Sequence, residues 1–92
     1  MNGTTHDHIY FTVRDLMNLR RTLEEFIRTA RQDNNAIIDL TNTLHSYWRD
    51  SQYDSFSQYI DRLTDDIDAS LVGLVRANDL LNEYIVELLR AV

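Results

Sequence analysis

Apolar residues recur every seven positions along the first half of this chain, and they form two rows. The first row contains Leu16, Leu23, Ala30, Ile37 and Leu44. The second row, three residues later in each repeat, contains Leu19, Phe26, Asp33, Leu40 and Tyr47. Such an alternation of three- and four-residue steps predicts a helix that packs along its length against another helix. Asp33 is the only polar member; it either pairs with an arginine across the contact or marks a local opening.

The second half of the chain repeats this pattern. One row contains Tyr53, Ile60, Ile67, Leu74, Leu81 and Leu88. The other contains Phe56, Leu63, Ser70, Ala77, Tyr84 and Ala91, of which only Ser70 is polar. Proline is absent and glycine occurs twice in 92 residues. Strand-rich folds need turn residues at several points, so the chain is predicted to be all-α with two long helices.

The break between the two helices is expected where the repeat changes phase. Leu44 and Tyr53 are nine residues apart, not seven, and Asp50 and Ser51 between them are good helix caps. Thr12, with Asp15 three residues later, is a second cap signal. We therefore predict one domain over 1–92, with helices at about 12–47 and 52–91, a turn at about 48–51, and a partly flexible segment 1–11. A connection this short makes the hairpin antiparallel.

Two helices packed against each other would leave much of the apolar surface of this hairpin exposed to water. Apolar residues beyond the two rows concentrate after residue 70, which predicts an association surface and a four-helix bundle formed by a homodimer or by a heterodimer with a similar hairpin. The predicted partner interface consists of Leu71, Val72, Val75, Leu80, Ile85 and Leu89. The small residues Ser70, Gly73 and Ala77 either let a facing helix approach closely or pack within the hairpin.

The composition excludes several classes of function. The formal net charge is −6 and every basic residue is arginine, so no basic patch predicts binding to nucleic acid. No cysteine is present, and no apolar run approaches the ~20 residues of a membrane-spanning helix. His45 has no acidic partner at helical spacing, and no set of nucleophile, base and orienting residue is visible. We expect no cofactor, no metal and no enzymatic activity.

The predicted turn contains the most specific motif in the sequence. Leu44 stands four residues before Trp48, and Phe56 stands eight residues after it. In these positions the chain resembles the Trp-X-Gly (WXG) family of small helical hairpins associated with type VII (ESX) secretion. Asp50 occupies the place of the family's glycine. Aspartate enters the positive-φ region more readily than most residues and also caps a following helix.

The resemblance implies a dimerising, non-enzymatic protein. Such a protein is either secreted itself or accompanies a larger effector to a secretion ATPase. Family members that carry the export signal have Tyr-x-x-x-Asp/Glu after the second helix, whereas here Leu88 follows Tyr84 at that spacing. The chain is then the partner without a signal, or it is not exported. We expect synthesis in the cytoplasm and, if secretion occurs, secretion without a cleaved signal peptide. The alternative is a cytoplasmic helical chaperone, adaptor or structural subunit unrelated to type VII secretion.

Overall fold

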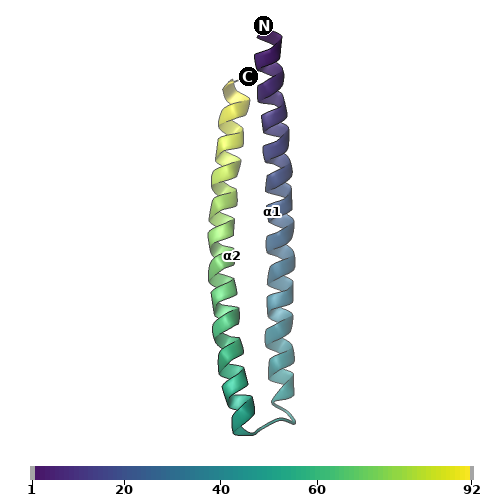
Figure 1. Cartoon of the computed structure of the whole chain (residues 1–92), viewed down its shortest axis with the longest axis vertical. Coiled ribbons are helices and arrows are strands. Elements are labelled where there is room, and N and C mark those ends of the chain that lie inside the picture. The colour runs from purple at the N-terminus through teal and green to yellow at the C-terminus, as the bar shows by residue number, and fades with distance from the viewer. Residues whose placement is uncertain (1, 92) are drawn as a thin grey trace. The chain divides into compact units, whose positions relative to one another are not determined.

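The computed structural model describes the backbone of residues 2–91 and the side chains of residues 12–91. Helix α1 spans Asn2–Leu44 and helix α2 spans Ser51–Ala91, and the described residues contain no strand (Figure 1). The prediction of an all-α helical hairpin is therefore confirmed. The chain divides into two compact units, which are described separately. Unit 1 is Met1–Ile27 with Leu74–Val92, and unit 2 is Arg28–Gly73, which includes the turn.

The helix boundaries differ from the predicted ones at both ends of α1. The backbone is already helical at Asn2, so Thr12 lies inside α1 and does not cap it. No proline precedes Thr12, and a potential cap residue does not start a helix where the preceding backbone can continue it. At its other end α1 stops at Leu44 instead of Tyr47. The segment 1–11 was predicted to be partly flexible; its side chains lie outside the described residues, so that prediction is not tested.

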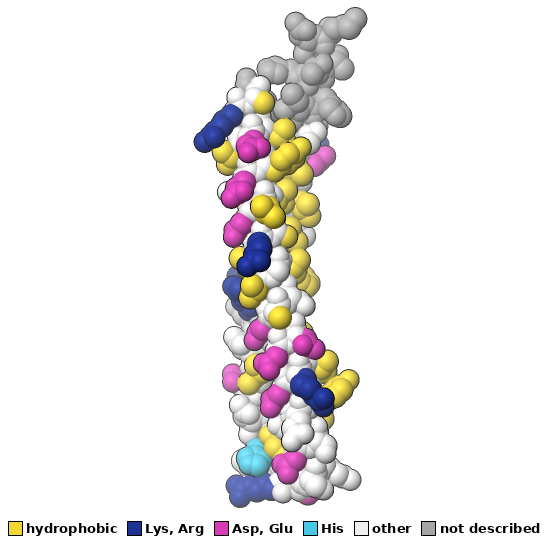
Figure 2. Space-filling view, turned by 90° about the vertical axis from the view of Figure 1, so that its left-hand side faces the viewer, with side chains coloured by type: hydrophobic (Ala, Val, Ile, Leu, Met, Phe, Trp, Pro, Cys, Tyr) yellow, Lys and Arg dark blue, Asp and Glu magenta, His cyan; other side chains and the backbone are white. Residues whose placement is uncertain are grey.

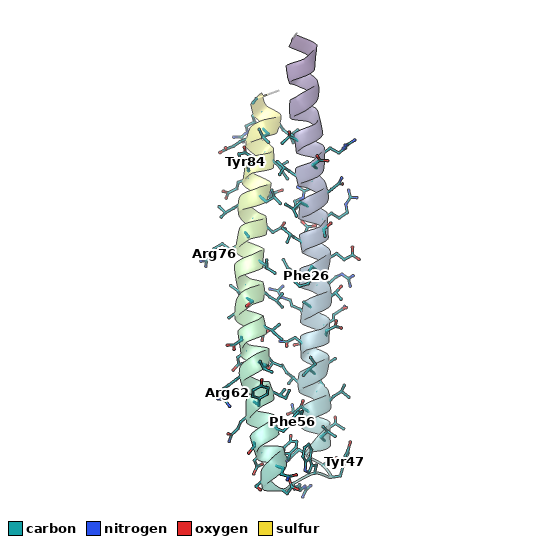
Figure 3. The ribbon with its side chains drawn as sticks, viewed as in Figure 1. Phe26, Tyr47, Phe56, Arg62, Arg76 and Tyr84 are labelled. Atoms are coloured by element: carbon teal, nitrogen blue, oxygen red, sulfur yellow. The ribbon has the colours of Figure 1, made fainter. Side chains whose placement is uncertain are left out.

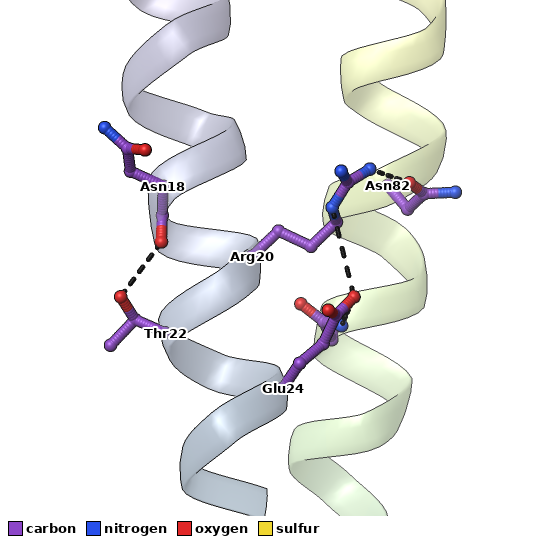
Figure 4. A network of polar contacts seen from close by, with 6 residues as sticks. Asn18, Arg20, Thr22, Glu24 and Asn82 are labelled. Atoms are coloured by element: carbon purple, nitrogen blue, oxygen red, sulfur yellow. Dashed lines mark hydrogen bonds and ion pairs between the residues drawn. The ribbon is translucent and has the colours of Figure 1, made fainter.

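In unit 1, the two helices meet along a seam with an apolar centre and a polar flank. Val13, Ile27 and Ile85 are buried there. Beside them Arg20 donates from its Nη1 to Oδ1 of Asn82 at 2.6 Å, and Asn78 donates from its Nδ2 to Oε1 of Glu24 at 3.5 Å (Figure 4). These two exposed pairs join α1 and α2 beside the apolar centre of the seam.

In unit 2, the seam is more polar. Asn34, with 2% of its surface exposed, donates from Nδ2 to the backbone carbonyl of Thr64 at 3.1 Å and to Oδ1 of Asp68 at 2.9 Å. Thr41 and Thr64 are also buried, and each hydroxyl donates to the carbonyl four residues earlier in its own helix. The buried apolar members of this seam are Tyr53 and Leu71.

The seam uses only one of the two rows that we predicted for each helix. On α1 the row that begins at Leu16 is partly buried, but its companion is the row Val13, Arg20, Ile27, Asn34 and Thr41. On α2 the row that begins at Tyr53 is joined by Ser57, Thr64, Leu71, Asn78 and Ile85. The rows predicted as companions, which begin at Leu19 and at Phe56, are exposed. Hydrophobicity favoured those rows; the structure instead buries Asn34, whose amide donates across the seam, and Thr41 and Thr64, whose hydroxyls donate within their own helices.

Candidate protein-interaction site

The turn is closed by Asp50, which caps α2. Its Oδ1 accepts hydrogen bonds from the backbone N–H of Tyr53 at 3.0 Å and from Nε1 of Trp48 at 2.9 Å. No described residue has a positive φ. Asp50 therefore closes the turn by capping α2 and not by entering the left-handed region, which separates the two explanations left open by the sequence.

Aromatic rings cover the end of the seam beside the turn. Tyr53 is buried at their centre, and its ring stacks on His45 with centroids 4.9 Å apart. Trp48 meets Tyr53 edge-on at 5.5 Å and lies at a tilt to Phe56 at 5.8 Å. Leu44, the last residue of α1, is partly buried. Trp48, Asp50 and Phe56 thus contact one another or Tyr53 at the turn, and the predicted motif did not include Tyr53.

The last carbonyls of α1 all have donors, although the helix ends without a glycine. The Tyr53 hydroxyl donates to the carbonyl of Thr41 at 2.9 Å. Backbone N–H groups of the turn donate to the next three carbonyls. His45 donates to the carbonyl of Asn42, Ser46 to that of Thr43, and both Tyr47 and Trp48 to that of Leu44. A helix end with its carbonyls satisfied is a stable stop. The turn is thus held by polar contacts as well as by its rings.

Each unit leaves a strongly apolar surface uncovered. In unit 1, the side chains are 47% exposed at Leu19, 56% at Phe26 and 54% at Tyr84. Phe26 lies on the side of α1 that is turned toward α2, whereas Arg76 points away from α1 (Figure 3). Figure 2 shows hydrophobic side chains of this unit gathered along the right-hand edge, with carboxylates and arginines over the surface of α2 that faces the viewer. The unit is therefore apolar on one flank of the seam.

In unit 2, the exposed row of α1 includes Leu40, 67% exposed, and that of α2 includes Phe56 and Leu63. Tyr59 extends the apolar surface on α2. On both helices the exposed row lies three residues after the inner row that begins at Leu16 or at Tyr53. Because the helices are antiparallel, equal offsets on the two helices place both exposed rows on the same flank of the seam. We call this flank of unit 2 the outer face.

The next row of α1 on this flank carries no charge after Asp15. It consists of Asp15, Thr22, Thr29, Ala36 and Thr43. Together with the row from Leu19 it makes a second set of three- and four-residue steps along the same helix. Apart from Ala36 this row is polar, so the apolar surface of α1 on this flank comes from the row that begins at Leu19.

The predicted partner interface is only partly exposed. Leu71 and Ile85 are 3% and 2% exposed and lie in the interiors of their own units, which corrects their assignment to the interface. They belong to the row Ser57, Thr64, Leu71, Asn78 and Ile85, which the sequence analysis did not identify as part of the seam. Val72, Leu80 and Leu89 are exposed, and Val75 is partly buried. Leu80 follows Ala77 by three residues and precedes Tyr84 by four, so it joins the exposed flank of unit 1.

The solvent-accessible area of the chain is larger than that of a typical folded monomer of its mass. The chain exposes 7225 Å². A folded monomer of 10.9 kDa exposes about 5,600 Å² by the usual scaling of area with mass. The difference is about twice the ~800 Å² that one partner buries in a protein–protein interface of standard size.

In the described residues, no helix has the length and apolarity needed to cross a membrane.

Comparison with protein-family models, with curated proteins and with solved structures found no match for this chain.

Proposed function

We propose that this protein acts by binding another helical protein through its exposed apolar flank, as one part of a helical bundle. The observation that carries the proposal is that each helix exposes a mostly apolar row, whereas one of its two rows in the seam contains several polar residues. Contiguous apolar surface of this kind on a water-exposed helix is typical of an interface. A second hairpin laid on the flank would complete a four-helix arrangement.

We also propose that the protein is not an enzyme. His45, the histidine within residues 12–91, stacks on Tyr53 and so has a packing role. Among the described residues, no group of three or more histidine, aspartate or glutamate side chains is placed to hold a metal ion. The polar side chains of the seam bond to one another and to backbone, which supports a structural use for them.

The biological setting that we favour is type VII secretion, with the chain acting as an exported hairpin or as the partner of a larger effector. The support is the motif Leu44, Trp48 and Phe56 on a two-helix hairpin, with Asp50 forming the turn in place of glycine. A chaperone, adaptor or structural subunit of another system is the second candidate, because hairpin geometry alone does not fix function. Export of the protein by cells that have, and cells that lack, the secretion ATPase separates the two.

The binding proposal is tested with Leu40→Glu combined with Tyr59→Glu. Both side chains are largely exposed, and glutamate is a good helix former, so the fold should survive. We expect sedimentation equilibrium of the native chain, alone and with helical proteins encoded beside it, to detect a complex that the double variant weakens at least tenfold. Two carboxylates buried against apolar side chains would oppose association.

The matched control is Asn35→Glu combined with Gln58→Glu, which adds the same charges at exposed positions away from the outer face. It should associate like the native chain. A native chain that remains monomeric at tens of micromolar, alone and with each of those proteins, would contradict the proposal. Equal loss of association in both double variants would show a general charge effect and would also contradict it.

A further inference from the structure

The outer face of unit 2 contains two carboxylates among its apolar side chains. Asp33 stands in the exposed row of α1, seven residues before Leu40. On α2, Ser70 stands in the exposed row, and Asp66 in the row beside it that contains Tyr59. The bond from Asn34 to Asp68 shows that this part of α1 lies beside this part of α2. Asp33, Asp66 and Ser70 therefore form the polar end of the outer face.

Neither carboxylate has a cation of its own. Asp33 and Asp66 are exposed and make no ion pair within the described residues. Arg62 is the arginine one turn before Asp66, and its side chain points away from α1 (Figure 3). A helix that covered the apolar part of the outer face and continued along it would remove water from Asp33. A buried carboxylate without a partner is strongly unfavourable, so the covering helix must supply a positive charge there.

A second copy of this chain does not supply that charge on the same surface. The rows that make up the outer face contain Thr29, Asp33, Ala36, Leu40 and Thr43 on α1, and Phe56, Tyr59, Leu63, Asp66 and Ser70 on α2. With two copies in register, the carboxylates of one face those of the other. Out of register, Asp33 meets an apolar side chain or a hydroxyl of threonine, serine or tyrosine, none of which carries a positive charge. The net charge of −6 on each chain adds repulsion in both arrangements.

We propose that the outer face selects a helical segment of a different protein, one whose apolar row is interrupted by an arginine or lysine that pairs with Asp33 and Asp66. The cation would lie about 10 Å along the partner helix from the residue that packs on Leu40, which is one seven-residue repeat. Arginine suits the site because its planar guanidinium can bond to carboxylates through several N–H groups. Asp33 then acts as a specificity residue that favours this partner over a second copy. The inference rests on the proposed binding function.

The test uses the chain itself as the probe. A full-length copy with Asp33→Arg and Asp66→Arg presents the same apolar rows with two cations in place of the carboxylates. We expect the native chain to bind this copy at least tenfold more tightly than either binds itself, as measured by sedimentation equilibrium with one species labelled. The gain should shrink as the salt concentration rises from 0.05 to 0.5 M, on the order of the screening expected for partly exposed charges. Circular dichroism establishes that the variant is helical.

The control copy carries Asp39→Arg and Asp65→Arg, which reverse two exposed carboxylates away from the outer face. It should bind the native chain no more tightly than the native chain binds itself. Self-association of the native chain as tight as the mixed pair would overturn this inference and leave the binding function intact, with a second copy as the partner. A further copy with Asp33→Leu and Asp66→Leu should self-associate through an uninterrupted apolar face. If neither that copy nor the mixed pair associates, both proposals fail.

Discussion

The inner seam and the exposed flank of the hairpin use polar residues in opposite ways. The seam contains Arg20, Asn34, Thr41, Thr64 and Asn78, whereas the exposed rows contain Leu19, Phe26, Leu40, Leu63 and Tyr84. A polar group is tolerated inside when it has a partner there, as Asn34 has in the carbonyl of Thr64 and in Asp68. An apolar group exposed to water has no such compensation within the chain. The difference indicates that polar contacts contribute to the pairing of the two helices, and that much of the available apolar surface stays exposed on the flank.

Asn34 illustrates what the polar seam contributes. Both of its Nδ2 bonds reach α2, but its Oδ1 is buried without a partner. Such a group adds little stability, because it loses water on one side while gaining bonds on the other. It does distinguish one register of the helices from others, since a shifted register would leave more of its groups unpaired. The seam thus gains specificity more than binding energy from this residue.

The largest expected difference between the two regions is that between two leucines in unit 2. Leu71→Ala removes a side chain that is 3% exposed and should lower the free energy of unfolding by about 2–5 kcal/mol. Leu40→Ala removes one that is 67% exposed and should change it by less than about 0.5 kcal/mol. Urea unfolding followed by circular dichroism at equal chain concentration measures both.

Association would alter this comparison, because Leu40 is expected to be buried in a complex. The measurement is therefore repeated at several dilutions. If Leu40→Ala were as costly as Leu71→Ala in the dissociated chain, the exposed rows would belong to the core of the hairpin. The distinction between seam and flank would then be wrong.

The sequence was sufficient to predict the two helices, because the seven-residue repeat and the absence of proline depend on local geometry. It was not sufficient to predict which rows meet. Each helix has three rows that can face a neighbour, and the most apolar pair is not the buried one. The buried row contains Asn34, whose partners Thr64 and Asp68 are about thirty residues away in the chain. A partner at that separation follows from the pairing of the helices, which periodicity alone does not reveal.

The turn was easier to predict than the seam. Asp50 was identified as a cap from its residue type and position, and its bond to the N–H of Tyr53 confirms that interpretation. The central position of Tyr53 was missed, because its hydroxyl bonds to the carbonyl of Thr41 on the other helix. Leu71 and Ile85 were assigned to the interface for a related reason. They lie outside the two rows that were predicted to be buried, so they were expected to be exposed.

A smaller effect is expected where the seam is closed by the turn. Asp50→Ala removes the cap of α2 and the bond from Trp48, and should cost about 0.5–2 kcal/mol. Asp50→Asn retains an oxygen acceptor and should cost less. Asp50→Gly keeps a tolerated cap residue but loses the Trp48 partner, so it should fall between them. Thermal melts of the three variants give the order. If all three melted together, neither bond would stabilise the turn.

The smallest expected effect lies on the exposed flank, at Gly73. It stands on α2 three residues after Ser70, and a Cβ built there would meet no atom within 4 Å. Gly73→Ala should therefore raise the free energy of unfolding by about 0.5–1 kcal/mol, because alanine loses less backbone entropy in a helix. Thermal unfolding of the dissociated chain measures the gain, and a loss of stability would mean that the helix requires glycine there. The same variant tests whether a partner approaches α2 closely at this point. An added methyl group that stabilises the chain but weakens its binding to the Asp33→Arg, Asp66→Arg copy would place Gly73 within the contact, whereas unchanged binding would place it outside.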